Sequence, residues 1–269
     1  MPDTTNPFPH AFVCCPFDLL LGRFQEQILS YRLNPEIGLN NGVLDRYLAT
    51  DFIRAANLLK DNELQTTIHA PFSDLSIGAL DPLVRDVTKT RLSKALEIAA
   101  IFDAKSVVVH SGFDTWHYAG HKQEWLDNAT GLLEELVSLA ERLDMYIALE
   151  NVFELGPDMH EELFKRIDSP RLGFCLDLGH QNVFSATGLL VWLETLGKWL
   201  RHIHLHDNKG KRDEHLCLGS GNVEFETFFK WLKHEEKNVV MTIEAHRDKD
   251  VLPSLKALSS YMSRFEIVM

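Results

Sequence analysis

Short runs of β-branched and apolar residues alternate along the chain with longer amphipathic stretches. The short runs have the length of buried strands, and the longer stretches repeat apolar positions at the three- and four-residue spacing of a helix. The pattern predicts eight strands, at residues 10–14, 36–39, 65–69, 106–110, 146–150, 172–177, 202–206 and 239–244. It predicts helices between them, among them 82–102, 123–143, 189–199, 224–235 and 252–265. The first of these has Pro82 in its first turn, where proline favours a helix start.

Eight strands that alternate with helices indicate a parallel sheet. A closed (β/α)8 barrel, or TIM barrel, holds them within one domain, because this fold typically uses about 250 residues. We therefore expect an α/β protein with a single TIM-barrel domain over residues 1–269. A doubly wound open sheet is the alternative. However, no G-x-G-x-x-G follows the first predicted strand, as the commonest cofactor sites of open sheets require.

The chain is acidic, with 39 acidic and 27 basic residues and a formal charge of −12. Proteins that grip nucleic acid through its phosphates carry basic faces, so this balance argues against a long polyanion as substrate. The four cysteines form no C-x-x-C pair, which fits a reduced compartment. No signal peptide is recognisable, and no apolar run reaches the length of about 18 residues that a membrane span needs. We expect a cytoplasmic protein without membrane contact, and the sequence leaves its oligomeric state open.

Metal-ligating side chains stand at the ends of six consecutive predicted strands. One such residue alone is more often a capping or solvated group, but the parallel strands of a barrel all end at one mouth, where six would converge. Imidazole and carboxylate groups are good ligands for divalent cations. Three buried carboxylates without a cation would repel one another and carry a heavy desolvation cost. The six residues are His69, His110, Glu150, Asp177, His204 and Glu244.

Three more candidate ligands follow the sixth and seventh predicted strands. His180 stands three residues after Asp177 in D-L-G-H, and Asp213 and His215 form D-E-H. The second motif is weak alone, because it equally fits a solvated loop. The following L-C-L-G-S-G-N contains glycines that would let the loop fold tightly over the barrel mouth.

These nine residues resemble the metal ligands of the xylose isomerase-like TIM barrels, in particular the endonuclease IV (AP endonuclease family 2) branch. The resemblance runs through the third to eighth strands and is most specific in E-N at Glu150, in D-L-G-H and in H-L-H-D…D-E-H-L-C-L-G-S-G-N. It implies a three-zinc cluster that hydrolyses phosphodiesters. It assigns His69, His110 and Glu150 to the first metal, Glu150, Asp177, His204 and Glu244 to the second, and His180, Asp213 and His215 to the third.

Two departures from that branch argue for a substrate other than DNA. The Arg- and Tyr-rich loops that read DNA have no counterpart, since the loop after the third strand reads PFSDLSIGALDP, and the loop from His204 to Asp213 is short. We expect a metal-dependent phosphoesterase that acts on a small phosphate ester or sugar phosphate. It would use two or three zinc ions, with manganese as the alternative. Glu150 and Glu244 are its candidate catalytic residues.

Two alternatives keep the barrel. In a sugar isomerase or epimerase, Glu150 and Glu244 would exchange protons with carbon, and Asp213 and His215 would have no necessary metal role. One metal would then grip the sugar oxygens, held by Glu150, Asp177, His204 and Glu244. A barrel that only binds a metal or small ligand would have closed coordination, without a position for substrate.

Four further residues are candidates for substrate contact, namely Asn151, His206, Trp116 and Arg247. His206 shares a strand face with His204 and could replace it as a ligand. Asn151 could orient the carboxylate that precedes it. Trp116 could stack on a sugar or base and Arg247 could meet a phosphate, although packing on the barrel and a plain surface charge explain these two equally well.

Overall fold

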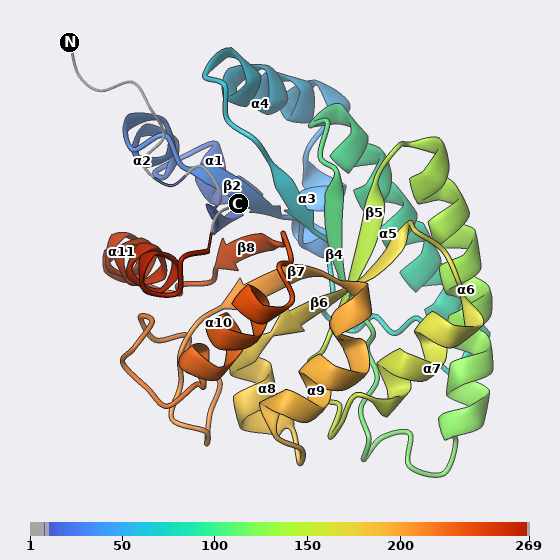
Figure 1. Cartoon of the computed structure of the whole chain (residues 1–269). Coiled ribbons are helices and arrows are strands. Elements are labelled where there is room, and N and C mark those ends of the chain that lie inside the picture. Colours follow the sequence, from blue (N-terminus) through green and yellow to red (C-terminus); the bar gives the residue numbers. More distant parts are fainter. Residues whose placement is uncertain (1–7, 9–10, 268–269) are drawn as a thin grey trace.

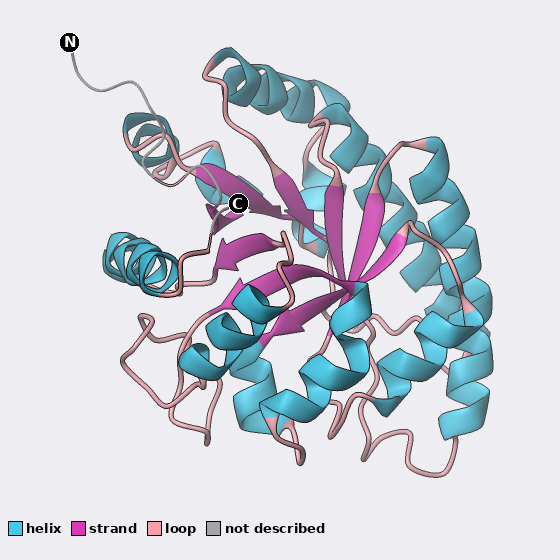
Figure 2. Cartoon of the chain, viewed as in Figure 1, coloured by secondary structure: helices cyan, strands magenta, loops and turns pink. Residues whose placement is uncertain are grey.

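The chain folds into a closed barrel of eight parallel strands, as the sequence predicts. The computed structural model describes residues 8 and 11–267. Strand β1 pairs with both β2 and β8, so the sheet closes on itself and the open-sheet alternative is wrong. Figure 1 shows the strands at the centre of the molecule, and Figure 2 shows helices surrounding them. The strands are β1 (Ala11–Pro16), β2 (Asn34–Gly38), β3 (Thr67–His69), β4 (Ser106–His110), β5 (Tyr146–Glu150), β6 (Leu172–Asp177), β7 (Leu200–Leu205) and β8 (Val240–Ile243).

Helices connect the strands and cover the outside of the barrel. Pro82 begins α5, and the Asp81 carboxylate caps it by accepting a hydrogen bond from the N–H of Leu83 at 2.8 Å. Among the described helices, none is both long and apolar enough to cross a membrane. The helices are α1 (Phe17–Leu20), α2 (Gln25–Ser30), α3 (Asn41–Arg46), α4 (Ala49–Asp61), α5 (Pro82–Ile101), α6 (Lys122–Arg142), α7 (Asp158–Arg166), α8 (Leu178–Phe184), α9 (Leu189–Leu196), the 3-10 turn η1 (Gly197–Trp199), α10 (Phe225–His234) and α11 (Asp248–Arg264).

The predicted element boundaries agree closely with these. Every described strand end lies within two residues of its predicted position, although the predicted start of the first strand, His10, lies outside the described residues. Helix α11 begins at Asp248, four residues before the predicted start. Its first turn carries Asp248 and Asp250, whose negative charges favour a helix N-terminus.

The register of the strands sets candidate ligands side by side. His110, at the end of β4, is paired with Glu150 at the end of β5, and Asp177 of β6 is paired with His204 of β7. Neighbouring strands lie about 4.8 Å apart, which is close enough for side chains from two strands to share one ion. The hydrogen-bonded barrel therefore fixes these two pairs without help from any loop.

An apolar layer lies inside the barrel beneath the candidate ligands. Val108, Ala148 and Cys175 form a small buried cluster. Each stands two residues before a candidate ligand on its own strand, so it points to the same side of the sheet. Close-packed interiors permit little movement, and this layer gives the strand ends a rigid base.

Candidate metal centre

Glu150 lies at the centre of the six residues at the strand ends. Its Oε2 atom is 3.2 Å from Nε2 of His69 and 3.0 Å from Nε2 of His110. Its Oε1 atom faces a different imidazole, that of His204, at 3.2 Å from Nδ1. The two oxygens of one carboxylate thus serve two ligand sets, which is the arrangement a carboxylate needs to bridge two cations.

Three carboxylates surround Nδ1 of His204. The Oε1 atoms of Glu150 and Glu244 each lie 3.2 Å away, and Oδ2 of Asp177 lies 3.8 Å away. All four side chains are buried, so their charges are poorly screened by water. Such a set favours a divalent cation among them. We call the following six residues the strand-end cluster: His69, His110, Glu150, Asp177, His204 and Glu244.

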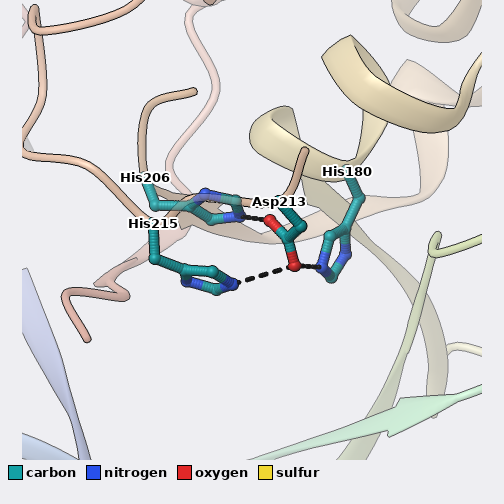
Figure 3. Close-up of side chains that lie close together, drawn as sticks. All are labelled: His180, His206, Asp213 and His215. Carbon is teal, nitrogen blue, oxygen red and sulfur yellow. Dashed lines mark hydrogen bonds and ion pairs between the residues drawn. The ribbon is translucent and has the colours of Figure 1, made fainter. Parts of the chain in front are cut away.

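A second cluster is centred on Asp213, in the loop between β7 and α10. Oδ2 of Asp213 lies 3.1 Å from Nε2 of His215 and 3.4 Å from Nε2 of His180. Oδ1 of the same carboxylate lies 3.7 Å from Nε2 of His206, which directly follows β7. Figure 3 shows all three contacts. We call these four residues, His180, His206, Asp213 and His215, the Asp213 cluster.

His180 joins the two clusters. Its Nδ1 atom lies 3.3 Å from Oε1 of Glu150 and 3.0 Å from the Asn151 carbonyl oxygen, while its Nε2 atom faces Asp213. Helix α8 positions this ring, because the Asp177 side chain caps the helix and accepts a hydrogen bond from the His180 N–H at 2.6 Å. In D-L-G-H, Asp177 is therefore the helix cap and His180 is the third residue of the helix.

The loop between β7 and α10 folds back onto the side chain of Asp207. Oδ2 of Asp207 accepts a hydrogen bond from the N–H of Gly221 at 2.7 Å, and Oδ1 accepts one from the N–H of Val223 at 3.1 Å. A Cβ atom on Gly221 would lie 2.1 Å from the carbonyl oxygen of Asn208, so a side chain is excluded there. The tight turn expected from L-G-S-G-N is present.

Two fully buried residues deeper in the barrel are absent from the sequence prediction. Oε1 of Glu36, on β2, lies 3.1 Å from Nε2 of His204, and Oε2 lies 3.1 Å from Nε2 of His202. Oε2 also accepts hydrogen bonds from the hydroxyls of Thr67, at 2.9 Å, and Thr242, at 3.1 Å. A carboxylate on the far nitrogen of a ligating imidazole orients the ring. The sequence did hold one signal for Glu36, since it is an acidic residue between two apolar positions in N-P-E-I-G.

Comparison with known proteins identifies the family of this barrel. The model of a family described as xylose isomerase-like TIM barrel matches residues 38–263, which is most of the chain. The chain belongs to this family. The predicted resemblance to the xylose isomerase-like TIM barrels is thereby confirmed.

Two of three similar proteins carry names from different reaction classes. Uncharacterized protein MJ1311 of Methanocaldococcus jannaschii is 34% identical over 224 residues, which cover 80% of this chain and 76% of that protein. Probable endonuclease 4 of Mycoplasma mobile is 29% identical over 196 residues, 66% of this chain and 67% of that one. A crystal structure of a D-tagatose 3-epimerase-like protein is 29% identical and superimposes with a TM-score of 0.86, covering 96% of this chain and 98% of its own. The family is therefore one of enzymes.

The buried carboxylates and histidines of this xylose isomerase-like barrel shift one another's pKa values. Burial raises the pKa of the Glu150 carboxyl, but the charges of His110 and His204 lower it by more, to well below its ordinary range. Burial also raises the pKa of the Asp177 carboxyl, but the charges of His180 and His206 outweigh it and lower this pKa to about 2. Burial lowers the pKa of His204, yet the surrounding negative groups raise it well above its ordinary value. Protons on histidines thus balance the carboxylates without a cation, and a divalent ion would displace them.

Unpartnered buried atoms give an independent test of whether a cation fits. Oδ2 of Asp177 and both ring nitrogens of His206 are buried and make no hydrogen bond to the described residues. A buried polar atom without a partner costs about 1–3 kcal/mol. Coordination by a cation would satisfy such atoms, and the surrounding imidazole and carboxylate groups suit zinc or manganese. The residues present therefore fit a divalent metal.

Three of the proposed substrate-binding residues, Asn151, Trp116 and Arg247, lie in different surroundings. The side chain of Asn151 donates a hydrogen bond to the Asp177 carbonyl at 3.0 Å and accepts one from the Asp177 N–H at 2.9 Å, so it joins β5 to β6. Trp116 is 85% exposed on the loop after β4. Arg247 forms an ion pair with Asp250 at 2.5 Å, at the start of α11. A substrate contact by these side chains remains a prediction.

Proposed function

We propose that this barrel is a metal-dependent hydrolase of phosphodiesters or phosphate esters. The observation that carries the proposal is the Glu150 carboxylate, because one oxygen faces His69 and His110 and the other faces His204. Two-metal phosphoesterases hold their ions about 3.5–4 Å apart, a separation that one bridging carboxylate spans. The first ion would be held by His69, His110 and Glu150, the second by Glu150, Asp177, His204 and Glu244, and a third by His180, Asp213 and His215.

Divalent ions bound there would supply a nucleophile at neutral pH and neutralise charge at phosphorus. The protein's own contribution is to hold the ligands rigidly and to exclude bulk water. Glu244 is 8% exposed, whereas Glu150 is 1% and Asp177 0% exposed. Glu244 is thus the carboxylate of the strand-end cluster nearest to an incoming substrate. We assign Glu150 and Glu244 the catalytic roles.

A small substrate fits this site better than DNA. The chain has a formal charge of −12, and the loop from Pro71 to Pro82 contains no arginine or tyrosine. Phe72 in this loop is half exposed, and its ring stacks on His110 with centroids 4.4 Å apart and planes at 21°. An exposed aromatic beside the first ligand set offers a surface for the carbon skeleton of a sugar phosphate or a similar ester.

A specific observation also supports the second candidate, sugar isomerisation or epimerisation. Glu150 and Glu244 converge on one imidazole nitrogen, each at 3.2 Å. Two such carboxylates on either side of a sugar carbon could remove and return a proton. The similarity to a D-tagatose 3-epimerase-like structure agrees with this candidate. Here one ion in the strand-end cluster is sufficient, and the Asp213 cluster is unnecessary.

The experiment is an activity panel on protein loaded with zinc or manganese. Phosphate monoesters, phosphodiesters and ketoses are assayed before and after chelation and reloading. We expect ester hydrolysis that is lost on chelation and restored by metal. Glu154→Gln is the matched control, since Glu154 is a buried carboxylate that binds Ser111 and Val152 outside both clusters. Fully loaded protein that hydrolyses no phosphate ester would contradict the proposal.

A double variant, Asp213→Asn with His215→Asn, separates the two candidates. If the enzyme is a phosphoesterase, loss of the cation beside the developing negative charge lowers its rate by about 100-fold. If it is an epimerase, the same variant keeps most of its activity. Epimerisation that survives in the double variant, without any hydrolysis in the parent, would favour the second candidate.

A further inference from the structure

We propose that His206 is a fourth protein ligand in the Asp213 cluster. The cation held there then has four protein ligands and no open position. Its role is to anchor the loop between β7 and α10 at the barrel mouth. This proposal concerns metal binding alone, and its test does not require the reaction to be known.

The four side chains of the Asp213 cluster point toward one another, as Figure 3 shows. One ligand atom from each residue lies within 4.8 Å of the others. The contacts of the Asp213 carboxylate are 3.1 Å to His215, 3.4 Å to His180 and 3.7 Å to His206. In a tetrahedral zinc site with bonds of about 2.0–2.1 Å, neighbouring ligand atoms lie about 3.3 Å apart. The cluster therefore needs only small shifts to close around an ion.

His206 is a fully buried imidazole that makes no aligned hydrogen bond to the described residues. Nδ1 has no partner among these residues, and Nε2 makes no aligned hydrogen bond, although it lies 3.1 Å from Oδ1 of Asp177. Helix α8 makes room for the ring, because a Cβ atom on Gly179 would lie 2.0 Å from its Cε1. A buried ring without an aligned hydrogen bond is costly, and a cation on Nε2 would remove part of that cost.

The ring geometry distinguishes this role from two others. His204, and not His206, lies between the carboxylates of Glu150 and Glu244, so His206 does not take its place. Nε2 of His206 also lies 3.1 Å from Oδ1 of Asp177, which would fit a residue that merely orients that carboxylate. However, the ring stacks on His215 with centroids 3.8 Å apart and planes at 11°, and both Nε2 atoms face Asp213.

Four protein ligands determine what the ion does. Structural zinc sites are closed by four protein ligands, whereas catalytic zinc keeps a position for water or substrate. His180 comes from α8, His206 follows β7, and Asp213 and His215 belong to the loop. One ion therefore ties three segments together beside the strand-end cluster. It adds positive charge to the mouth without binding substrate.

The test compares His206→Ala with a matched control, His246→Ala. His246 stacks on the other face of His215, with centroids 3.6 Å apart and planes at 13°. Both variants lose a ring stacked on His215, but only the first loses a proposed ligand. Zinc per chain is measured at equilibrium with a competing chelator. We expect the affinity for one ion to fall at least tenfold in His206→Ala, and the His246→Ala protein to match the parent.

Cobalt substitution adds a readout of coordination, because four-coordinate cobalt(II) absorbs visible light far more strongly than six-coordinate cobalt(II). We expect the parent to show intense absorption from this site and His206→Ala to lose it. His206→Gln tests the alternative, since its longer amide reaches the position of Nε2 and can still donate to Asp177. Full zinc affinity with unchanged cobalt absorption in His206→Gln or His206→Ala would overturn the proposal. These measurements do not use ester hydrolysis. Their result therefore stands even if the barrel proves not to be a phosphoesterase.

Discussion

The strand-end cluster and the Asp213 cluster lie side by side but are built by different means. The first consists of side chains on or directly after strands, where the hydrogen-bonded register sets pairs such as His110 with Glu150. The second depends on a loop that is held by the side chain of Asp207 and on the first turn of α8. A barrel therefore provides one rigid ligand set from its sheet, and loops supply additional ligands beside it.

The two clusters also differ in charge. Glu150, Asp177 and Glu244 give the strand-end cluster three carboxylates, whereas the Asp213 cluster has one among three histidines. Three buried carboxylates need more positive charge than one divalent ion brings. The difference supports two ions in the first cluster and one in the second. Each cluster should then lose its ions independently of the other.

Glu150→Gln is expected to have the largest effect. The amide removes the negative charge shared by two ligand sets, so the strand-end ions are lost and the Asp213 ion remains. Hydrolysis should fall by about 1000-fold or more, because transition-state stabilisation by these ions disappears. Zinc per chain and ester hydrolysis measure both effects. Loss of all zinc would show that the clusters do not bind metal independently.

Asp207→Ala is expected to weaken the Asp213 cluster selectively. It removes the acceptor for the N–H groups of Gly221 and Val223, whose hydrogen bonds to Asp207 are partly buried. Hydrogen bonds to charged groups contribute about 1.5–3 kcal/mol each, so we expect urea unfolding to show a loss of about 3 kcal/mol. The Asp213 ion should bind at least tenfold more weakly, and the strand-end ions should be unaffected. Equal weakening of all ions would contradict the separation of the two clusters.

Glu36→Gln tests whether a buried carboxylate orients His204 in the strand-end cluster. The Glu36 carboxylate lies 3.1 Å from Nε2 of His204, on the side of the ring away from the other carboxylates. Loss of such an orienting partner typically weakens metal binding by about 10–100-fold. We expect this loss for one strand-end ion, measured by competition with a chelator. Unchanged affinity would mean that the ring is held by packing alone.

The smallest predicted effect is the pH dependence of stability in metal-free protein. The pKa values of His204 and His180 are raised well above their ordinary 6.5 by nearby carboxylates that outweigh burial. A raised pKa in the folded state stabilises the protein fully below the unfolded pKa, and this contribution is lost as pH rises through the folded pKa. Urea unfolding of chelated protein should therefore show falling stability from pH 6.5 upward. Zinc-loaded protein should lack this fall, since the ions replace the protons.

The sequence alone predicted the barrel and the convergence of six strand ends, because periodicity and strand order carry that information. His180, Asp213 and His215 came from a resemblance in motifs, and their proximity depends on how a loop folds. Glu36 and His202 were missed, because the acidic residue in N-P-E-I-G does not reveal partners that come from strands far apart in the chain. The position of His206 follows from the space left at Gly179, which no local pattern encodes.

The most direct test of the account is a crystal structure of the zinc-loaded protein with anomalous scattering at the zinc edge. We expect two peaks that share Glu150 as a ligand and a third peak enclosed by the Asp213 cluster, with His206 coordinated. A single peak in the strand-end cluster and none at Asp213 would contradict it and favour an epimerase. A third ion that holds a water in place of His206 would contradict the closed site.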